Sequence, residues 1–184
     1  MGNIEIRLHG RGGQGAVSAA DMLVAAFTHE GKYAAGFPVF GSERRGAPTQ
    51  AFVRFGDEPV REKTKIYHPH CIWVFDPMQI QTPTTYSGLQ QQGTMVTNIS
   101  RPLTEKPHEN INRLGTVKAT PIAMEILGIP AVSTCMLGAF AATTQWVKLD
   151  SVLAILPDYF KGKILDKNIV CVERGFKETD VVER

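Results

Sequence analysis

Cysteine is scarce in this sequence, and the few that occur stand alone. The 184 residues include 3 cysteines, Cys71, Cys135 and Cys171, which lie far apart and form no C-x-x-C pair. A disulfide framework is therefore not expected, and neither is an iron–sulfur cluster held by this chain, because such a cluster usually takes about four thiolates. Each cysteine has apolar neighbours, so we expect three buried thiols that act as small hydrophobic side chains.

Strong net charge and long apolar runs are also missing. The 20 Lys and Arg residues face 18 Asp and Glu residues, a formal net charge of +2 that gives no reason to expect nucleic-acid binding. No apolar run reaches the roughly 18 residues of a membrane helix, and no signal-peptide pattern opens the chain. We therefore expect a cytoplasmic protein with no membrane partner, and the length suits one domain, residues 1–184.

Strand-like and helix-like segments alternate along the chain. Apolar alternation predicts a strand at residues 4–9, and apolar spacing predicts a helix at 14–29. This alternation indicates an α/β fold: a Rossmann-like three-layer domain with a mostly parallel sheet and helices on both faces. Further strands are expected at residues 32–37 and 49–55 and in "CIWVFDP", "TMVTNIS" and "GTVKAT", and further helices are expected to begin near Thr120, Ser133 or Thr134, Asp150 and Asp166.

A glycine-rich turn joins the first strand to the first helix. Gly10, Gly12 and Gly15 fit the pattern G-x-G-x-x-G in this setting. Such a turn presents backbone N–H groups at the positive end of a helix, which suits phosphate, and Arg11 adds a cation to the same loop. Glycine is needed where a Cβ would block close approach or a positive φ angle. The pattern leaves open a dinucleotide, another phosphate ligand, or a turn that only packs helix on strand.

The dinucleotide interpretation makes a further demand that this sequence does not meet. An acidic residue is expected about 20 residues beyond the motif, at the end of the second strand, where it binds the ribose hydroxyls. That region reads "KYAAGFPVFG", and the first acidic residue is Glu43, beyond the expected strand end. The sequence therefore disfavours an NAD site. An NADP site that uses Arg44 or Arg45 is favoured still less.

A second segment, residues 36–56, carries two adjacent arginines in an aromatic and glycine-rich loop. Arg44 and Arg45 lie between Gly41 and Gly46 in "GFPVFGSERRGAPTQAFVRFG". An arginine guanidinium presents a planar fork that suits phosphate or carboxylate. A solvated pair of surface arginines is the alternative. The loop follows the strand after the glycine turn, so we expect both segments to face the same end of the sheet.

Several segments together resemble a known family. "IRLHGRGGQGAVSAADMLVAA", "GFPVFGSERRGAPTQAFVRF", "IYHPHCIWVFDP" and "STCMLGAF", in this order, are similar to the gamma subunits of 2-oxoacid:ferredoxin oxidoreductases, pyruvate synthase among them. The resemblance spans nearly the whole chain. It implies a complex that oxidatively decarboxylates a 2-oxoacid such as pyruvate, passes the acyl group to coenzyme A and passes two electrons to ferredoxin.

The resemblance also implies a division of labour between chains. Thiamine diphosphate, Mg and the [4Fe–4S] clusters are expected in the alpha, beta and delta subunits, with none bound by this chain alone. This chain is expected to be a noncatalytic gamma subunit that supports assembly and coenzyme A binding, to be inactive in isolation and to self-associate when alone. The alternative is a stand-alone Rossmann-type nucleotide-binding oxidoreductase. The expected coenzyme A contacts are Gly10, Arg11, Gly12, Gly13, Gln14, Gly15, Arg44, Arg45, Gly46 and Thr49, with Gln14 organising the turn; no catalytic or metal-binding residue is expected.

Overall fold

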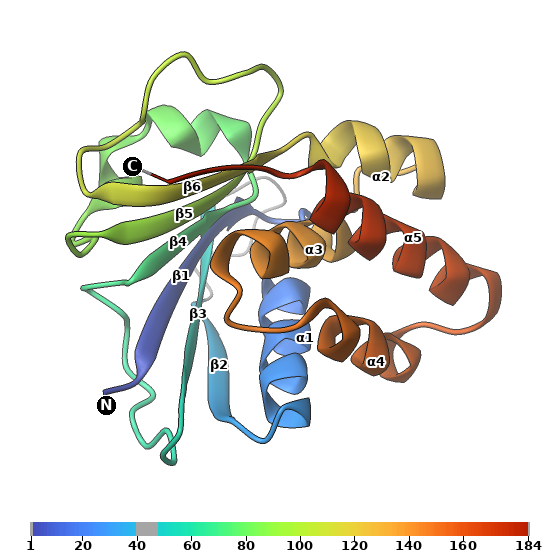
Figure 1. Cartoon of the computed structure of the whole chain (residues 1–184), viewed down its shortest axis with the longest axis horizontal. Helices are drawn as coiled ribbons and strands as arrows, with labels where there is room; N and C mark the ends of the chain where they lie inside the picture. Colours follow the sequence, from blue (N-terminus) through green and yellow to red (C-terminus); the bar gives the residue numbers. More distant parts are fainter. Residues whose placement is uncertain (1, 40–47, 184) are drawn as a thin grey trace.

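The fold is built on a single sheet, seen in a computed structural model that describes residues 2–39 and 48–183. The sheet has 7 strands in the order β2-β3-β1-β4-β5-β6-β7 (Figure 1). The strands are β1 (Ile4–Arg11), β2 (Tyr33–Val39), β3 (Pro48–Gly56), β4 (Cys71–Val74), β5 (Gly93–Asn98), β6 (Ile111–Val117) and β7 (Asp180–Glu183). The short edge strand β7 was not expected from the sequence.

The sheet is mixed, with a parallel centre. Strands β1, β4, β5 and β6 pair in parallel, whereas β3 pairs antiparallel with both β1 and β2 and β7 pairs antiparallel with β6. Only β3 and β7 therefore run against the other strands. The α/β class is confirmed, and the one departure that matters for function is that β3 separates β2 from β1.

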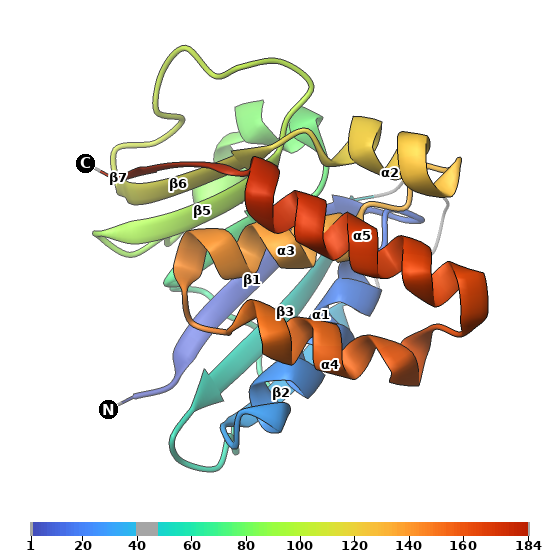
Figure 2. The same ribbon diagram turned by 45° about the vertical axis from the view of Figure 1, so that its right-hand side comes forward.

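The α-helices all gather on one face of the sheet, as Figures 1 and 2 agree. The other face carries the short 3-10 helices η1 (Pro77–Gln81) and η2 (Pro83–Tyr86). Three layers are therefore present, as predicted, but the second face is covered by short 3-10 turns and loops. The α-helices are α1 (Ala16–His29), α2 (Ala119–Leu127), α3 (Ser133–Thr144), α4 (Leu149–Tyr159) and α5 (Gly162–Glu178).

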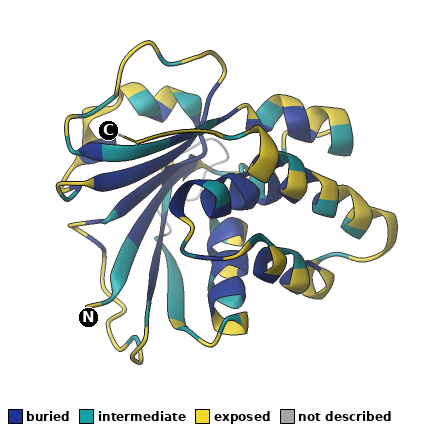
Figure 3. Ribbon diagram, in the orientation of Figure 1, coloured by how far each residue is buried: buried dark blue, intermediate teal, exposed yellow. Residues whose placement is uncertain are grey.

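Both faces of the central strands are buried (Figure 3). The larger apolar cluster lies between the sheet and the α-helices and includes Trp73, Phe27 and Phe140. A smaller cluster lies under η2 and includes Ile72 and Tyr86. Because β4 contributes to both clusters, burial on two sides explains its continuous apolar run.

Two buried arginines fasten the second face of the sheet to its loops. The guanidinium of Arg7 on β1 donates to the carbonyls of Thr85 (3.1 Å) and Ser87 (2.7 Å). Arg54 on β3 donates to the carbonyl of Thr64 at 2.7 Å. Backbone carbonyls left without partners would be costly to bury, so these arginines allow irregular segments to cover the sheet. Burial lowers the pKa of Arg7 from its ordinary value.

Helices α3 and α5 approach each other at glycines. A Cβ on Gly138 of α3 would lie 2.0 Å from the carbonyl oxygen of Val172 on α5. A Cβ on Gly175 of α5 would lie 2.0 Å from the carbonyl oxygen of Cys135 on α3. The two backbones are therefore in direct contact. This contact buries α3, which is apolar on nearly every side, inside the chain itself.

Several predicted helix starts need correction. The last helix begins at Gly162, so Asp166 lies inside it and does not cap it. The α2 cap position is Lys118 and not Thr120, and Gly128 ends that helix in a left-handed conformation. α3 does begin at Ser133, but Val132 holds its cap position. In α4 the cap position is Lys148, with Asp150 in the first turn, and the helix runs past Pro157 to Tyr159.

The three cysteines are free and buried, which confirms the sequence expectation. Burial raises the pKa of the Cys135 thiol to about 12 and also raises those of Cys71 and Cys171. Within residues 2–39 and 48–183, no group of His, Cys, Asp and Glu side chains has the arrangement of a metal site. No helix in this part of the chain is both long and apolar enough to cross a membrane.

Candidate functional site

The glycine turn occupies residues 12–15, between the end of β1 and the start of α1. Gly13 has φ +92° and Gly15 has φ +84°, backbone conformations that residues other than glycine rarely adopt. The Gln14 side-chain oxygen accepts a hydrogen bond from the Arg11 N–H at 2.8 Å, and the Gln14 N–H donates to the Arg11 carbonyl at 3.1 Å. Gln14 therefore organises the turn, as the sequence suggests.

Helix α1 starts without a cap from any described side chain. Gly15 occupies the cap position and the first turn holds no acidic residue. The first N–H groups of a helix have no acceptor within it, and they carry the positive end of the helix dipole. This end of α1 can therefore receive an anion through backbone N–H groups.

Packing explains part of the glycine pattern. A Cβ on Gly15 would lie 3.0 Å from the Ser133 Cβ at the start of α3, and one on Gly10 would lie 3.2 Å from the Ala16 Cβ. A Cβ on Gly13 would meet nothing within 4 Å. Close packing therefore accounts for Gly10, packing and backbone conformation together account for Gly15, and backbone conformation alone accounts for Gly13, at the open side of the turn.

Thr49 lies beside the glycine turn. In the antiparallel pairing of β1 with β3, Thr49 is opposite Gly10 and Pro48 is opposite Arg11. Val39, the last residue of β2, pairs with Gln50 at the same edge of the sheet. Arg44, Arg45 and Gly46, the other predicted contacts, lie outside the described residues, but the residues that flank their segment, Val39 and Pro48, both lie at the edge that carries the turn.

Two residues that the sequence analysis did not single out, Asp76 and Gln79, complete this edge. Asp76 follows β4 and forms an ion pair with the Arg11 guanidinium. The Gln79 side-chain amide donates to the Gly10 carbonyl at 3.1 Å. The sequence did hold a signal, because Asp followed by Pro after an apolar strand is typical of a helix start. Residues 71–77 were interpreted instead as a single strand.

The turn lies where the chain paths diverge. β1 leads into α1 on one face, and β4 leads into η1 on the other face (Figure 1). In α/β sheets, ligands bind at the carboxyl ends of strands where such a divergence occurs. In a dinucleotide fold the second strand lies next to the first and ends in an acidic residue. Here β3 separates β2 from β1, and β2 contains no acidic residue, so the geometry favours a phosphate ligand other than NAD.

The imidazole closest to the turn is locked in a neutral state. His9 Nε2 accepts a hydrogen bond from Arg7 Nε at 3.0 Å, and the ring is almost fully buried. Burial and the Arg7 charge lower the pKa of His9 to about 3. His9 is therefore a structural acceptor and not a proton carrier at neutral pH. The described groups at this edge of the sheet are therefore suited to binding a phosphate ligand and not to proton transfer.

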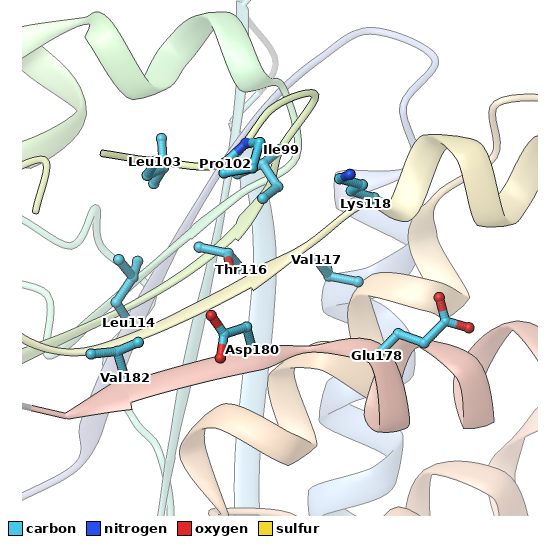
Figure 4. Close-up of a pocket in the computed structure, with 10 residues that line it drawn as sticks. All are labelled: Ile99, Pro102, Leu103, Leu114, Thr116, Val117, Lys118, Glu178, Asp180 and Val182. Atoms are coloured by element: carbon cyan, nitrogen blue, oxygen red, sulfur yellow. The ribbon is translucent and has the colours of Figure 1, made fainter. Parts of the chain in front are cut away.

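A separate pocket of about 320 Å³ lies between β6, β7 and the loop that follows β5 (Figure 4). Its lining includes the apolar side chains of Leu103, Leu114 and Val182 and the charged side chains of Lys118 and Asp180. None of its lining residues belongs to the glycine turn. Residues 111–117 form β6, so the strand expected in "GTVKAT" begins earlier in the chain than that segment.

Comparison with known proteins identifies the family. Residues 5–178 match the model of the pyruvate ferredoxin/flavodoxin oxidoreductase family, so the chain belongs to that family. Within it the chain is a gamma subunit, because it matches gamma subunits over nearly their full length. This agrees with the resemblance noted in the sequence. The stand-alone Rossmann-type oxidoreductase finds no support among these matches.

Three relatives illustrate the match. The pyruvate/ketoisovalerate oxidoreductases common subunit gamma of Thermococcus kodakarensis is 45% identical, over 98% of this chain and 99% of that protein. Pyruvate synthase subunit PorC of Methanothermobacter marburgensis is 47% identical, over 90% of this chain and 91% of that protein. The crystal structure of pyruvate oxidoreductase subunit PORC from Thermotoga maritima superposes with a TM-score of 0.87, at 32% identity and 100% coverage of both chains.

Proposed function

We propose that this chain is a noncatalytic subunit of a pyruvate-oxidising complex and that its glycine turn holds a phosphate of coenzyme A. The observation that carries the proposal is the turn itself. Gly13 and Gly15 have positive φ angles and open an α-helix that no described side chain caps, at the point where β1 and β4 diverge. Coenzyme A carries a diphosphate and a 3′-phosphate and does not require the acidic ribose binder that β2 lacks.

In the proposed complex the glycine turn donates backbone N–H groups to phosphate, and arginine adds charge-assisted contacts. Arg45, and less strongly Arg44, supply these contacts, and the Thr49 hydroxyl donates from the start of β3. The remaining glycines let the ligand approach the backbone closely. The proposed contact set is Gly10, Arg11, Gly12, Gly13, Gln14, Gly15, Arg44, Arg45, Gly46 and Thr49.

Other chains supply the redox chemistry in this proposal. The described residues hold no arrangement suited to a metal, and all three thiols are buried. In line with the family resemblance, thiamine diphosphate, Mg and the [4Fe–4S] clusters are assigned to the alpha, beta and delta subunits, and ferredoxin reaches the complex through them. The complex is proposed to work in the cytoplasm. The role proposed for this chain is to bind and orient coenzyme A for the acyl transfer.

The subunit role is tested by reconstitution. The purified chain alone should show no turnover with pyruvate, coenzyme A and ferredoxin, because in this proposal the other subunits supply the groups that perform the chemistry. Addition of the alpha, beta and delta subunits should restore coenzyme-A-dependent ferredoxin reduction. Nicotinamide-dependent turnover by the isolated chain with any substrate would contradict the proposal and restore the stand-alone alternative.

A further inference from the structure

We infer that Asp76 is a positioning residue of the coenzyme A site: it holds the Arg11 guanidinium beside the glycine turn so that the turn meets phosphate in one fixed arrangement. The inference rests on the proposed function. Asp76 does not belong to the set of residues that the family resemblance implies. Its place in the fold and the use of both of its carboxylate oxygens indicate this role.

The fold places Asp76 next to Arg11 through the pairing of β1 with β4. The registered pairs end at His9 opposite Val74, and the Phe75 N–H then donates to the His9 carbonyl at 2.8 Å. Arg11 and Asp76 each lie two residues beyond that last pair, so the neighbouring strands β1 and β4 place them side by side at the same edge of the sheet. The Arg11 side chain is 43% exposed, whereas that of Asp76 is only 7% exposed, so a buried carboxylate anchors a cation that solvent and ligands can reach.

Both oxygens of the Asp76 carboxylate are engaged. One oxygen accepts from Arg11 Nε, and the other accepts from the Met78 N–H at 3.1 Å, which makes Asp76 the N-cap of η1. The Gln79 amide from the same short helix donates to the Gly10 carbonyl. The N-cap and Gln79 of η1 therefore hydrogen-bond to Arg11 and Gly10, the two residues that immediately precede the turn.

The negative charge of Asp76, taken alone, would disfavour phosphate binding at this site. A carboxylate near a bound phosphate repels it, so removal of that charge by itself should tighten binding. A carboxylate that orients an arginine acts in the opposite direction, because a pre-oriented side chain loses less conformational entropy when the ligand binds. The two roles therefore predict opposite changes in affinity for the same substitution.

Asp76→Asn separates these roles. Asparagine offers one acceptor oxygen and one NH₂ group, so it cannot accept from both Arg11 Nε and the Met78 N–H with the aspartate geometry. Asparagine is a good N-cap, so η1 is expected to be retained while the ion pair between Asp76 and Arg11 is lost. In the assembled complex we expect the Kd for coenzyme A to rise about tenfold, the lower end of what one charge-assisted contact supplies.

Three controls accompany this measurement. Asp150→Asn removes the same charge from the exposed start of α4 and should leave the Kd unchanged. Turnover with pantetheine, an acyl acceptor without phosphates, should be unaffected by Asp76→Asn. Arg11→Gln should weaken coenzyme A binding by itself, and Asp76→Asn should add little further loss in the Arg11→Gln background, because Asp76 acts through Arg11.

The outcomes distinguish this inference from the proposed function. Unchanged or tighter binding in Asp76→Asn, or a full additional loss in the Arg11→Gln background, would overturn the positioning role while leaving the coenzyme A site intact. If neither Arg11→Gln nor Arg45→Ala changes the Kd, the proposed function fails and the inference falls with it. Should Asp76→Asn fail to assemble, Asp76→Glu replaces it: the charge is kept but the guanidinium is displaced, so positioning predicts weaker binding and charge alone predicts no change.

Discussion

Replacement of Arg45 by alanine in the assembled complex should raise the Michaelis constant for coenzyme A about ten- to hundredfold, the equivalent of one charge-assisted contact of about 1.5–3 kcal/mol. The segment that contains Arg45 connects Val39 to Pro48, and both flanking residues lie at the edge of the sheet that carries the glycine turn. The contact is made to phosphate, so the Michaelis constant for pantetheine should not change. Thiamine diphosphate binding and the first decarboxylation step, which needs no coenzyme A, should also stay the same.

Arg61→Ala provides the matched control, since Arg61 is an exposed arginine in the loop between β3 and β4. It removes the same charge away from the turn and should leave coenzyme A kinetics unaltered. Gly12→Val adds a Cβ within the turn and should mimic the loss in Arg45→Ala. If Arg45→Ala and Gly12→Val both leave these kinetics untouched in an intact complex, the turn only packs helix on strand and the chain is a scaffold.

The second large effect concerns stability. Gly138→Ala should lower the free energy of unfolding of the isolated chain by about 3 kcal/mol, because it overpacks a contact between two backbones. The added Cβ would lie 2.0 Å from the Val172 carbonyl oxygen and 2.7 Å from the Phe176 nitrogen, so α3 and α5 must move apart. Denaturant unfolding, monitored by circular dichroism, measures the change.

The direction of the stability change distinguishes a backbone contact from an ordinary helix position. In an open helix interior, alanine in place of glycine stabilises by about 1 kcal/mol. Gly175→Ala should also destabilise, because its Cβ would lie 2.0 Å from the Cys135 carbonyl oxygen. A stabilising effect of either substitution would show that α3 and α5 do not meet at their backbones.

Local sequence patterns predicted the elements that begin the fold. The alternation at residues 4–9 marked β1, and the glycine turn before an apolar helical pattern marked α1. The alternation could not show that the second face of β1 is also buried. Arg7 and His9 can lie there because they hydrogen-bond to each other and because Arg7 also donates to backbone carbonyls. Those carbonyls belong to segments far away in the chain, so no local pattern could reveal them.

The errors have similar causes. α5 begins before Asp166 because its early residues, such as Leu165, pack against the main core, and packing overrides a capping residue. β7 is short and exposed and exists because it pairs with β6, which no local pattern reveals. Asp76 and Arg11 are 65 positions apart, and they meet only because β4 is the parallel neighbour of β1.

Hydrogen exchange in the assembled complex tests the central claim most directly. The backbone N–H groups of residues 12–18 include the first donors of α1, which have no acceptor within the helix. If the glycine turn holds a phosphate of coenzyme A, these amides should exchange more slowly when coenzyme A is added, and pantetheine should have no such effect. Unchanged exchange at residues 12–18 under saturating coenzyme A would contradict the proposed site.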